Sequence, residues 1–322
     1  MGFDWVKERS LRGHQGAVLG CSLAGNYVLT CGEDRTVRLF NPTRSGEGED
    51  QSDGTDETAF LVHTFQGPHG YRVLDVSVKK DHSAFASCGD DKMSFIWDVN
   101  TSKVKRKMFG HHGPINSICF GAKNEDIVCS ASNDQTIRVY DLRSHNRDGV
   151  QILSGFRDSV SSVRISDYQI VAGSIDGCIR TFDVRAAKMF KDTIGDSISY
   201  IELSTDLAGS NLVVASCVGD KGSVVLVDRD SGLVLKHYEG HLNVENRIGC
   251  GIYSSRTGKD RIICGSEDGY VYIWDLLTGK VVDREKVHDT SLSAIGVSGD
   301  RMVSCAYDGG ASTYKLVSTE TG

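Results

Sequence analysis

Residues 85–98 read FASCGDDKMSFIWD, and this stretch decides the fold. A run of small and apolar residues is interrupted by the acidic pair Asp90 and Asp91, and a second apolar run ends at Trp97. Two short runs of this kind on either side of a Gly/Asp turn are typical of antiparallel strands joined by a tight connection. The stretch therefore predicts a strand–turn–strand unit.

The same order of features occurs seven times along the chain. The other six copies are LTCGEDRTVRLFN from Leu29, CSASNDQTIRVYD from Cys129, VAGSIDGCIRTFD from Val171, VASCVGDKGSVVLVD from Val214, ICGSEDGYVYIWD from Ile263 and VSCAYDGGASTYK from Val303. Successive copies place their last aromatic or apolar residue 57, 43, 42, 45, 47 and 40 residues apart, at Phe40, Trp97, Tyr140, Phe182, Val227, Trp274 and Tyr314. A period of roughly 40 to 45 residues is typical of propeller blades. No stretch has convincing helical periodicity, so the prediction is all-β.

The repeats resemble those of the WD40 family, and the resemblance covers nearly the whole chain. Gly-His pairs or their relatives precede most copies, at Gly13-His14, Gly67-Pro68-His69, Gly110-His111, Gly240-His241 and Val287-His288. The resemblance implies a seven-bladed WD40 β-propeller in which a His, a strand Ser or Thr, the turn Asp and the Trp form a buried hydrogen-bonded tetrad. The second blade matches this structural tetrad completely, with His69, Ser87, Asp91 and Trp97.

Other blades depart from that tetrad. Blade six has Cys264 in place of the hydroxyl, beside His241, Asp268 and Trp274. Blade three ends in Tyr140, and blades four and five lack the His. We expect weaker tetrads in these blades, with their strands intact.

Closure of the ring depends on the N-terminal residues. Seven blades of four strands close only if the last blade gains a fourth strand, and residues 5–11 precede the first Gly-His pair where an outermost strand belongs. We expect them to pair with the strands formed from residues 291–317, which removes an open sheet edge. Residues 1–322 then form one propeller domain with joined ends.

The composition narrows the classes of partner. The chain has 322 residues, with 36 Lys+Arg against 43 Asp+Glu, a net charge of −7. This balance disfavours binding to nucleic acid or an anionic membrane by bulk charge. No apolar run reaches the roughly 20 residues needed to span a bilayer, and residues 1–10 lack the apolar core of a signal peptide. We expect a monomeric propeller within a complex, located in the cytoplasm, with the nucleus as a second location.

Catalytic chemistry is not expected. The sets of His, Asp and Ser repeat in blade after blade, whereas a catalytic triad occurs once in a pocket. The adjacent His111 and His112 lack a third ligand at useful local spacing, and the ten cysteines lack zinc-site spacing. We predict no catalytic residues, metal or cofactor, and reduced, buried cysteines. A propeller enzyme with a site in the central channel is the alternative from a different class.

Residues 44–59 form an acidic insertion in blade one. Six carboxylates against Arg44 give it a net charge of −5, and it lacks aromatic residues. It follows the third strand of the blade, which places it on the face opposite the Gly-His loops, where it should be solvated and flexible. Two interpretations stay open, an insertion without function and an acidic docking tail.

The resemblance to WD40 propellers also implies where binding residues lie. Side chains just after the Gly-His pair, at the start of the inner strand, and beside the turn Asp face one surface of such propellers. We therefore predict a protein-binding surface formed by Leu19, Glu33, Arg35, Arg72, Leu74, Asp90, Lys92, Asn116, Asn133, Gln135, Arg157, Ile175, Lys221, Arg247, Glu267 and Tyr307. Mixed charge with a few apolar groups suits a protein or peptide better than an enclosed small molecule.

Several stretches are similar to the mitogen-activated protein kinase organiser family of WD-repeat scaffolds. They are NYVLTCGEDRTVRLFNP from Asn26, GYRVLDVS from Gly70, SCGDDK from Ser87 and RDSVSSVRISDYQIVAGSIDG from Arg157. The resemblance implies a non-enzymatic scaffold that assembles kinase-cascade components. Members of this family are also associated with the spliceosome, so a splicing-complex subunit is the alternative.

Overall fold

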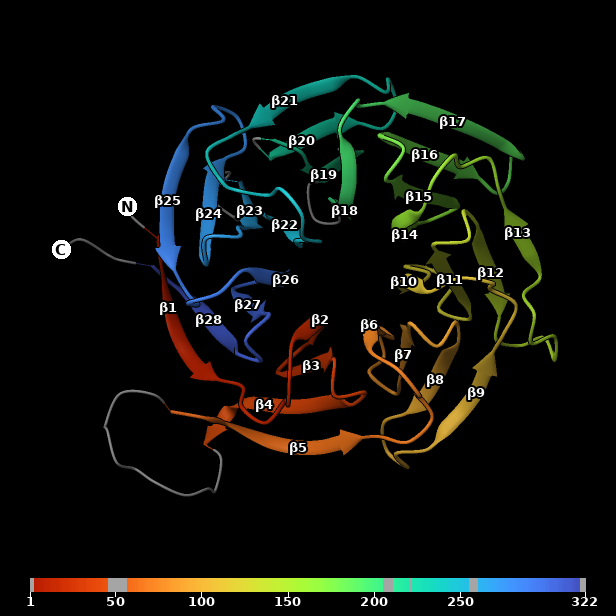
Figure 1. Ribbon diagram of the computed structural model, residues 1–322, viewed down its shortest axis with the longest axis horizontal. Helices are drawn as coiled ribbons and strands as arrows, with labels where there is room; N and C mark the ends of the chain where they lie inside the picture. Colours follow the sequence, from red (N-terminus) through yellow and green to blue (C-terminus); the bar gives the residue numbers. More distant parts are fainter. Residues whose placement is uncertain (1–2, 46–56, 205–210, 221, 255–259, 319–322) are drawn as a thin grey trace.

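The computed structural model describes residues 3–45, 57–204, 211–220, 222–254 and 260–318. All elements within these residues are strands, and they form seven four-stranded sheets arranged in a ring (Figure 1). Each sheet is antiparallel, as expected when short apolar runs are joined by tight Gly/Asp turns. The predicted all-β, seven-bladed propeller is confirmed.

The first four blades follow the chain in order. Blade one contains β2 (Val18–Ala24), β3 (Tyr27–Gly32), β4 (Val37–Ser45) and β5 (Ala59–Phe65). Blade two contains β6 (Val73–Val78), β7 (Ala84–Gly89), β8 (Ser94–Asp98) and β9 (Val104–Met108). Blade three contains β10 (Ile115–Phe120), β11 (Ile127–Ser132), β12 (Ile137–Asp141) and β13 (Gln151–Leu153). Blade four contains β14 (Val160–Ser166), β15 (Gln169–Ser174), β16 (Cys178–Asp183) and β17 (Lys188–Thr193).

The remaining blades complete the ring. Blade five contains β18 (Ser197–Leu203), β19 (Leu212–Val218), β20 (Ser223–Asp228) and β21 (Val234–Tyr238). Blade six contains β22 (Cys250–Tyr253), β23 (Arg261–Gly265), β24 (Tyr270–Asp275) and β25 (Val281–Lys286). Blade seven contains β26 (Leu292–Ser298), β27 (Arg301–Ala306) and β28 (Ala311–Ser318), with β1 (Phe3–Ser10) as its outermost strand.

The N-terminal strand closes blade seven as predicted. Strand β1 pairs antiparallel with β28, from Phe3 opposite Ser318 to Ser10 opposite Ser312. The Trp5 side chain is 8% exposed and lies edge-on to the ring of Tyr253 in blade six, with ring centroids 5.8 Å apart. The first strand therefore covers the sheet edge and also packs against the neighbouring blade.

The core is divided among the junctions between blades. Each of seven clusters of buried apolar side chains draws on two adjacent blades, because alternate residues of a strand face opposite sides of its sheet. Nine of the ten cysteines are buried, as predicted, whereas Cys21 is half-buried. The described residues contain no helix that could cross a membrane.

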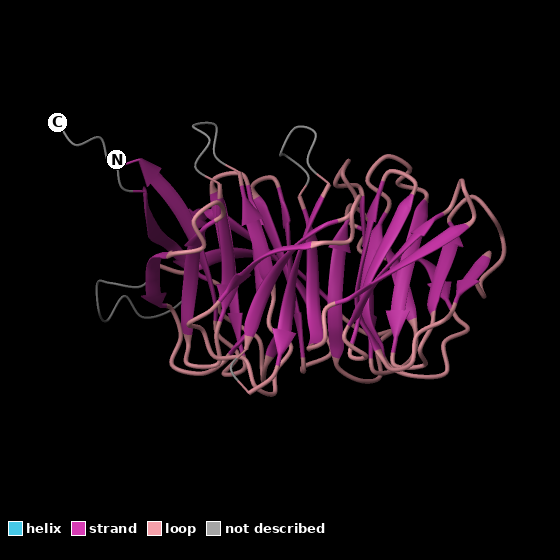
Figure 2. Ribbon diagram, turned by 90° about the horizontal axis from the view of Figure 1, so that it is seen from above, coloured by secondary structure: helices cyan, strands magenta, loops and turns pink. Residues whose placement is uncertain are grey.

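The loops lie on two faces of a disc whose strands run between them (Figure 2). The top face carries the loops that enter the inner strands and the turns between second and third strands. His14 and Asp34, which are hydrogen bonded across 2.9 Å, show that both kinds of loop meet there. The bottom face carries the other described connections, such as the one from β8 to β9.

The structure corrects the boundaries of the acidic insertion. Strand β4 continues to Ser45, which pairs with Ala59 of β5, so both ends of the predicted segment are ordered strand. The Glu57 carboxylate lies 2.8 Å from Arg9 of β1, and the Glu57 carbonyl accepts a 3.0 Å hydrogen bond from the Ser10 amide. Residues 46–56 lie outside the described residues.

Candidate protein-interaction surface

The tetrad of blade two uses all four of its polar side chains. The two ring nitrogens of His69 lie 2.7 Å from Asp91 and 2.8 Å from the Ser87 hydroxyl. The Trp97 ring nitrogen donates to the same hydroxyl at 2.9 Å. Buried polar atoms need such partners, so these groups tie the top loops to the strands and are not free for chemistry.

Blades one and three repeat the contacts of the His. His14 lies 2.9 Å from Asp34 and 2.8 Å from Thr30, and His111 lies 2.8 Å from both Asp134 and Ser130. Burial opposes ionisation of Asp134, but hydrogen bonds from His111 and neighbouring groups hold its pKa well below the usual value. The turn carboxylates are therefore fixed structural anions.

Blade six has the residues of a tetrad without its hydrogen bonds. Both ring nitrogens of His241 are buried without a partner, and burial lowers its pKa to about 4. The Trp274 ring nitrogen donates to the Glu239 carbonyl at 3.0 Å, and Asp268 accepts from the Tyr272 hydroxyl at 3.1 Å. A thiol at Cys264 is a weak substitute for the hydroxyl that joins the groups in blade two.

Blade four holds its turn carboxylate with an arginine. Phe156 follows Gly155 where other blades have His, and the side chain of Arg180 is 1% exposed. The Arg180 guanidinium makes two hydrogen bonds to Asp176, at 3.0 and 2.7 Å, and its carbon lies 4.7 Å from the centre of the Phe156 ring. Loss of the His therefore does not weaken this blade in the way that the sequence suggested. The bidentate pair replaces it.

The predicted binding residues lie along the top-face loops to different depths. The exposed ones are Glu33, Arg35, Arg72, Lys92, Asn133, Gln135, Arg157 and Ile175. The half-buried ones are Leu19, Leu74, Asp90, Asn116, Arg247, Glu267 and Tyr307. Lys221 lies outside the described residues.

Three groups of these residues are joined by hydrogen bonds. Arg72 donates to Asp90 at 2.6 Å within blade two. Asn116 donates to Asn133 at 2.6 Å and to Ser159 of the next blade at 3.1 Å. Glu267 accepts the backbone amides of residues 245 and 246, both at 2.8 Å, which fixes the long entry loop of blade six.

A top-face cavity of about 340 Å³ lies among blades three to six. Its lining is mostly serine and asparagine, including Asn116, Asn133 and Asn246, with Ile175 and Arg247. A polar hollow of this size could receive one side chain of a protein partner.

Arg247 departs from the prediction that its side chain faces the top surface. Its guanidinium donates to the Leu74 carbonyl at 3.3 Å, lies 3.8 Å from the Asp75 carboxylate, and stacks 5.4 Å from the centre of the Tyr200 ring. These residues belong to inner strands, so Arg247 reaches across the channel. The sequence shows the longer loop but not that its last side chain turns inward.

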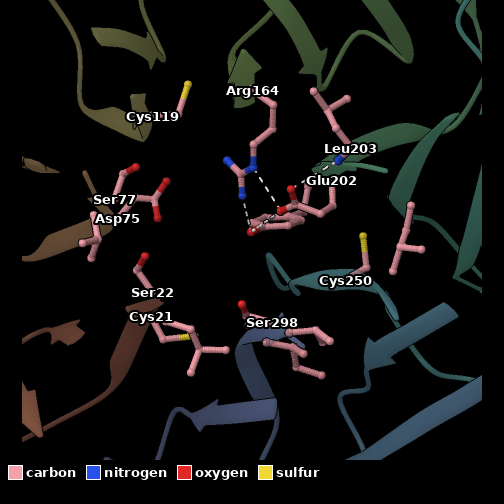
Figure 3. A pocket seen from close by; sticks show the side chains of 18 of the residues that line it. Cys21, Ser22, Asp75, Ser77, Cys119, Arg164, Glu202, Leu203, Cys250 and Ser298 are labelled. Atoms are coloured by element: carbon pink, nitrogen blue, oxygen red, sulfur yellow. Dashed lines mark hydrogen bonds and ion pairs between the residues drawn. The ribbon is translucent and has the colours of Figure 1, made fainter. Parts of the chain in front are cut away.

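Below Arg247 the channel contains a cavity of about 440 Å³ with charged walls (Figure 3). Arg164 donates to Glu202 at 3.0 Å and is bonded to the hydroxyl of Tyr200. Asp75 accepts from the Ser117 hydroxyl at 2.8 Å. Sequence reasoning missed this network, although charged residues in the inner strands are its visible signal. Within the described residues, no group of three His, Cys, Asp or Glu side chains could hold a metal ion.

Comparisons with known proteins agree with this geometry. The family model described as WD domain, G-beta repeat matches residues 5–41, 60–98, 102–141 and 232–275. These segments cover most of blades one, two, three and six. Blade four, in which Arg180 pairs with Asp176, lies between the third and fourth segments.

Full-length relatives are similar over most of the chain. WD repeat domain-containing protein 83 of Homo sapiens is 39% identical, over 82% of this chain and 77% of its own length. The Xenopus tropicalis protein of the same name is 33% identical, over 97% and 93%. A Dictyostelium discoideum homolog of that protein is 27% identical, over 88% and 90%.

Proposed function

The chain belongs to the WD40 repeat family, and on that premise we propose that it is a non-enzymatic scaffold that assembles several proteins. One contrast carries the proposal. The recurring His, Asp and Ser or Thr groups of blades one to three are bonded to one another inside the blades, whereas the exposed side chains of the top-face loops differ from blade to blade. A surface of varied, exposed polar groups suits recognition of proteins.

A comparison of two surface variants tests the scaffold proposal. The top-face variant carries Arg72→Glu, Asn133→Lys and Arg157→Glu, and the control carries Lys80→Glu and Lys103→Glu, at exposed positions in the bottom-face connections of blade two. We expect the top-face variant to unfold at the wild-type temperature and to lose most proteins captured by the wild type, because a few anchors dominate interfaces. A folded top-face variant that keeps every partner, with a control that loses them, would place binding elsewhere.

We propose further that the assembled proteins are components of a mitogen-activated protein kinase cascade. Support comes from the similarity of the stretches that begin at Asn26, Gly70 and Arg157 to scaffolds of the organiser family. Affinity purification from cytoplasmic and nuclear extracts, followed by identification of the bound proteins, tests this assignment. Recovery of kinase-cascade proteins supports it, and recovery of spliceosomal proteins in their place supports the splicing alternative.

A further inference from the structure

The seven turns between second and third strands share one hydrogen bond. In every blade the last residue of the turn, in a left-handed conformation, donates its amide to the carbonyl three positions earlier. The donors are Arg35, Lys92, Gln135, Gly177, Gly222, Gly269 and Gly309, with N···O distances of 3.1 to 3.3 Å. Their φ angles lie between 60° and 87°. The position is therefore equivalent in all seven turns, and its residue identity can be compared directly.

Blades four to seven have glycine at this position because the neighbouring blade covers it. A Cβ atom on Gly177 would lie 2.8 Å from the Gly195 carbonyl oxygen, and one on Gly222 would lie 2.7 Å from the Asn243 amide nitrogen. Gly309 is similarly limited by the Gly16 carbonyl oxygen at 2.9 Å, and Gly269 by that of His288. Side chains are excluded from this part of the rim.

Blades one to three keep side chains in the same strained conformation. Arg35, Lys92 and Gln135 have φ angles of 64°, 63° and 65°, and all three side chains are exposed. A left-handed conformation is unfavourable for residues with a Cβ, and glycine would adopt it without that penalty. Non-glycine residues held in such conformations cluster at functional sites. We call the top-face loops of these blades, residues 12–17, 33–36, 67–72, 90–92, 110–114 and 133–136, the open sector.

The exposed charged side chains of the open sector are mostly cationic. Tyr71 is 66% exposed, next to Arg72, whose side chain is 53% exposed. Arg35 reaches from blade one to the Gly70 carbonyl of blade two at 3.4 Å, so Arg35 and Arg72 both lie beside Tyr71. Of the five carboxylates in the sector, Asp34, Asp91 and Asp134 are at most 10% exposed and bonded to histidines, Asp90 is bound by Arg72, and Glu33 lies 3.3 Å from the Ala17 amide.

The top-face loops of blades six and seven carry more exposed carboxylates. They are Glu245, Asp268, Asp289 and Asp308, of which Asp289 lies 2.9 Å from Lys286. The exposed cations of the open sector are complementary to a negative partner, which the carboxylates of blades six and seven would repel.

We propose that the open sector docks an acidic peptide segment of a partner protein. Tyr71 is the apolar anchor, and Arg35, Arg72 and Lys92 donate hydrogen bonds to the carboxylates of the peptide. This inference rests on the proposed scaffold function and specifies the chemistry of one partner. Arginine and tyrosine are the residue types enriched in interface anchors, and arginine matches carboxylate geometry with two parallel donors.

Glycine substitution separates binding from folding in this sector. The probe is a fluorescein-labelled peptide of glutamate and aspartate with one central leucine, measured by fluorescence anisotropy at low and physiological salt. We expect Arg35→Gly with Lys92→Gly to weaken the peptide affinity on the order of tenfold while the unfolding midpoint stays equal or rises, because the left-handed strain is relieved. The charge-matched control Lys80→Gln with Lys103→Gln, in the bottom-face connections of blade two, should bind as the wild type does.

The outcomes discriminate between the two proposals. Equal affinity of the glycine variant and the wild type, or equal binding of a lysine-rich peptide, would overturn acidic docking at the open sector. So would a wild-type chain that does not bind the acidic peptide at low salt. If cellular partners are lost from the top-face variant but kept by the glycine variant, the scaffold proposal stands and the open-sector inference fails.

Discussion

Blades two and six show how much depends on one hydroxyl group. The Ser87 hydroxyl in blade two is hydrogen bonded to both His69 and Trp97, whereas Cys264 stands at the equivalent position of blade six. There the Trp274 nitrogen donates to a backbone carbonyl and both nitrogens of His241 have no partner. A motif can thus keep most of its residues and lose its hydrogen-bond network, because one small shared hydroxyl joins the larger groups.

Blade four teaches the complementary lesson. Arg180 has equivalents at Arg38 and Arg138 in blades one and three, where a His also approaches the turn Asp. Arg38 lies 3.5 Å from Asp34, but Arg180 makes a buried bidentate pair with Asp176. In blades one, three and four the turn carboxylate is therefore held by a buried partner, and that partner need not be a histidine.

The largest expected effect comes from removing the substitute partner in blade four. Arg180→Met should lower the free energy of unfolding by about 3 to 5 kcal/mol, because it leaves the buried Asp176 carboxylate uncompensated. The double variant with Asp176→Asn should recover much of the loss. Urea denaturation measures both. A single variant as stable as the wild type would show that the pair does not hold the blade.

Acid should destabilise the protein through the unpartnered histidine of blade six, His241. The unfolded chain protonates His241 near its ordinary pKa of 6.5, whereas burial holds the folded pKa at about 4. Because the unfolded state binds the proton first, the free energy of unfolding falls by about 3 kcal/mol from this group as pH drops from 6.5 to 4.

The variant His241→Phe should remove that part of the pH dependence and leave stability at pH 7 equal or higher, since two unpaired buried nitrogens are lost. Burial also lowers the pKa of His288, so some slope should remain. Burial opposes ionisation of Asp176 too, but its bonds to Arg180 lower the pKa to about 2, which confines its effect to pH below 3.8. An unchanged slope between pH 6.5 and 4 in the variant would contradict this account.

A smaller loss should follow removal of the shared hydroxyl in blade two. Ser87→Ala leaves His69 and Trp97 each with an unpaired nitrogen and should cost about 2 kcal/mol. Cys264→Ala in blade six breaks no such network and should cost less than about 1 kcal/mol. Denaturation of the two variants side by side would refute the comparison if their losses were equal.

The smallest effect is expected at the exposed turn carboxylate of blade six. Asp268→Asn should change the free energy of unfolding by less than about 0.5 kcal/mol, because its contacts are with the exposed turn and Tyr272. The matched Asp91→Asn should lose several times as much, since it removes the charge that His69 faces. Thermal unfolding of both proteins measures the difference.

The blades could be predicted from the sequence because their signals are local. Apolar runs, turn aspartates and the period between Trp97 and Tyr140 are all read along a few dozen residues. The partners that bridge separate loops could not be predicted in this way. From the sequence alone, the arginine in the third strand of blade four is expected to be exposed, but Phe156 and Asp176 enclose Arg180 in the structure. The inward orientation of Arg247 depends on its contact with blade two across the channel.

For the predicted top-face residues, the sequence shows where the turns lie but not whether the neighbouring blade leaves room for a side chain. Lys92 and Gly177 occupy equivalent turns, yet only the approach of the neighbouring blade excludes a side chain from the second. That approach depends on how the loop around Gly195 packs, and the repeat pattern does not encode it.

The pairing of β1 with β28 has a consequence for biosynthesis. Thr313 donates to the Arg9 carbonyl across a sequence separation of 304 residues, so β1 is synthesised long before the strand that it pairs with. Until then the apolar side chains of Leu11 and Val18, which pack against blade seven in the folded protein, are exposed to solvent. Contacts of such long range slow folding and leave nascent chains open to aggregation. Ring closure should therefore be a late step in maturation, and the one at which chaperone assistance matters most.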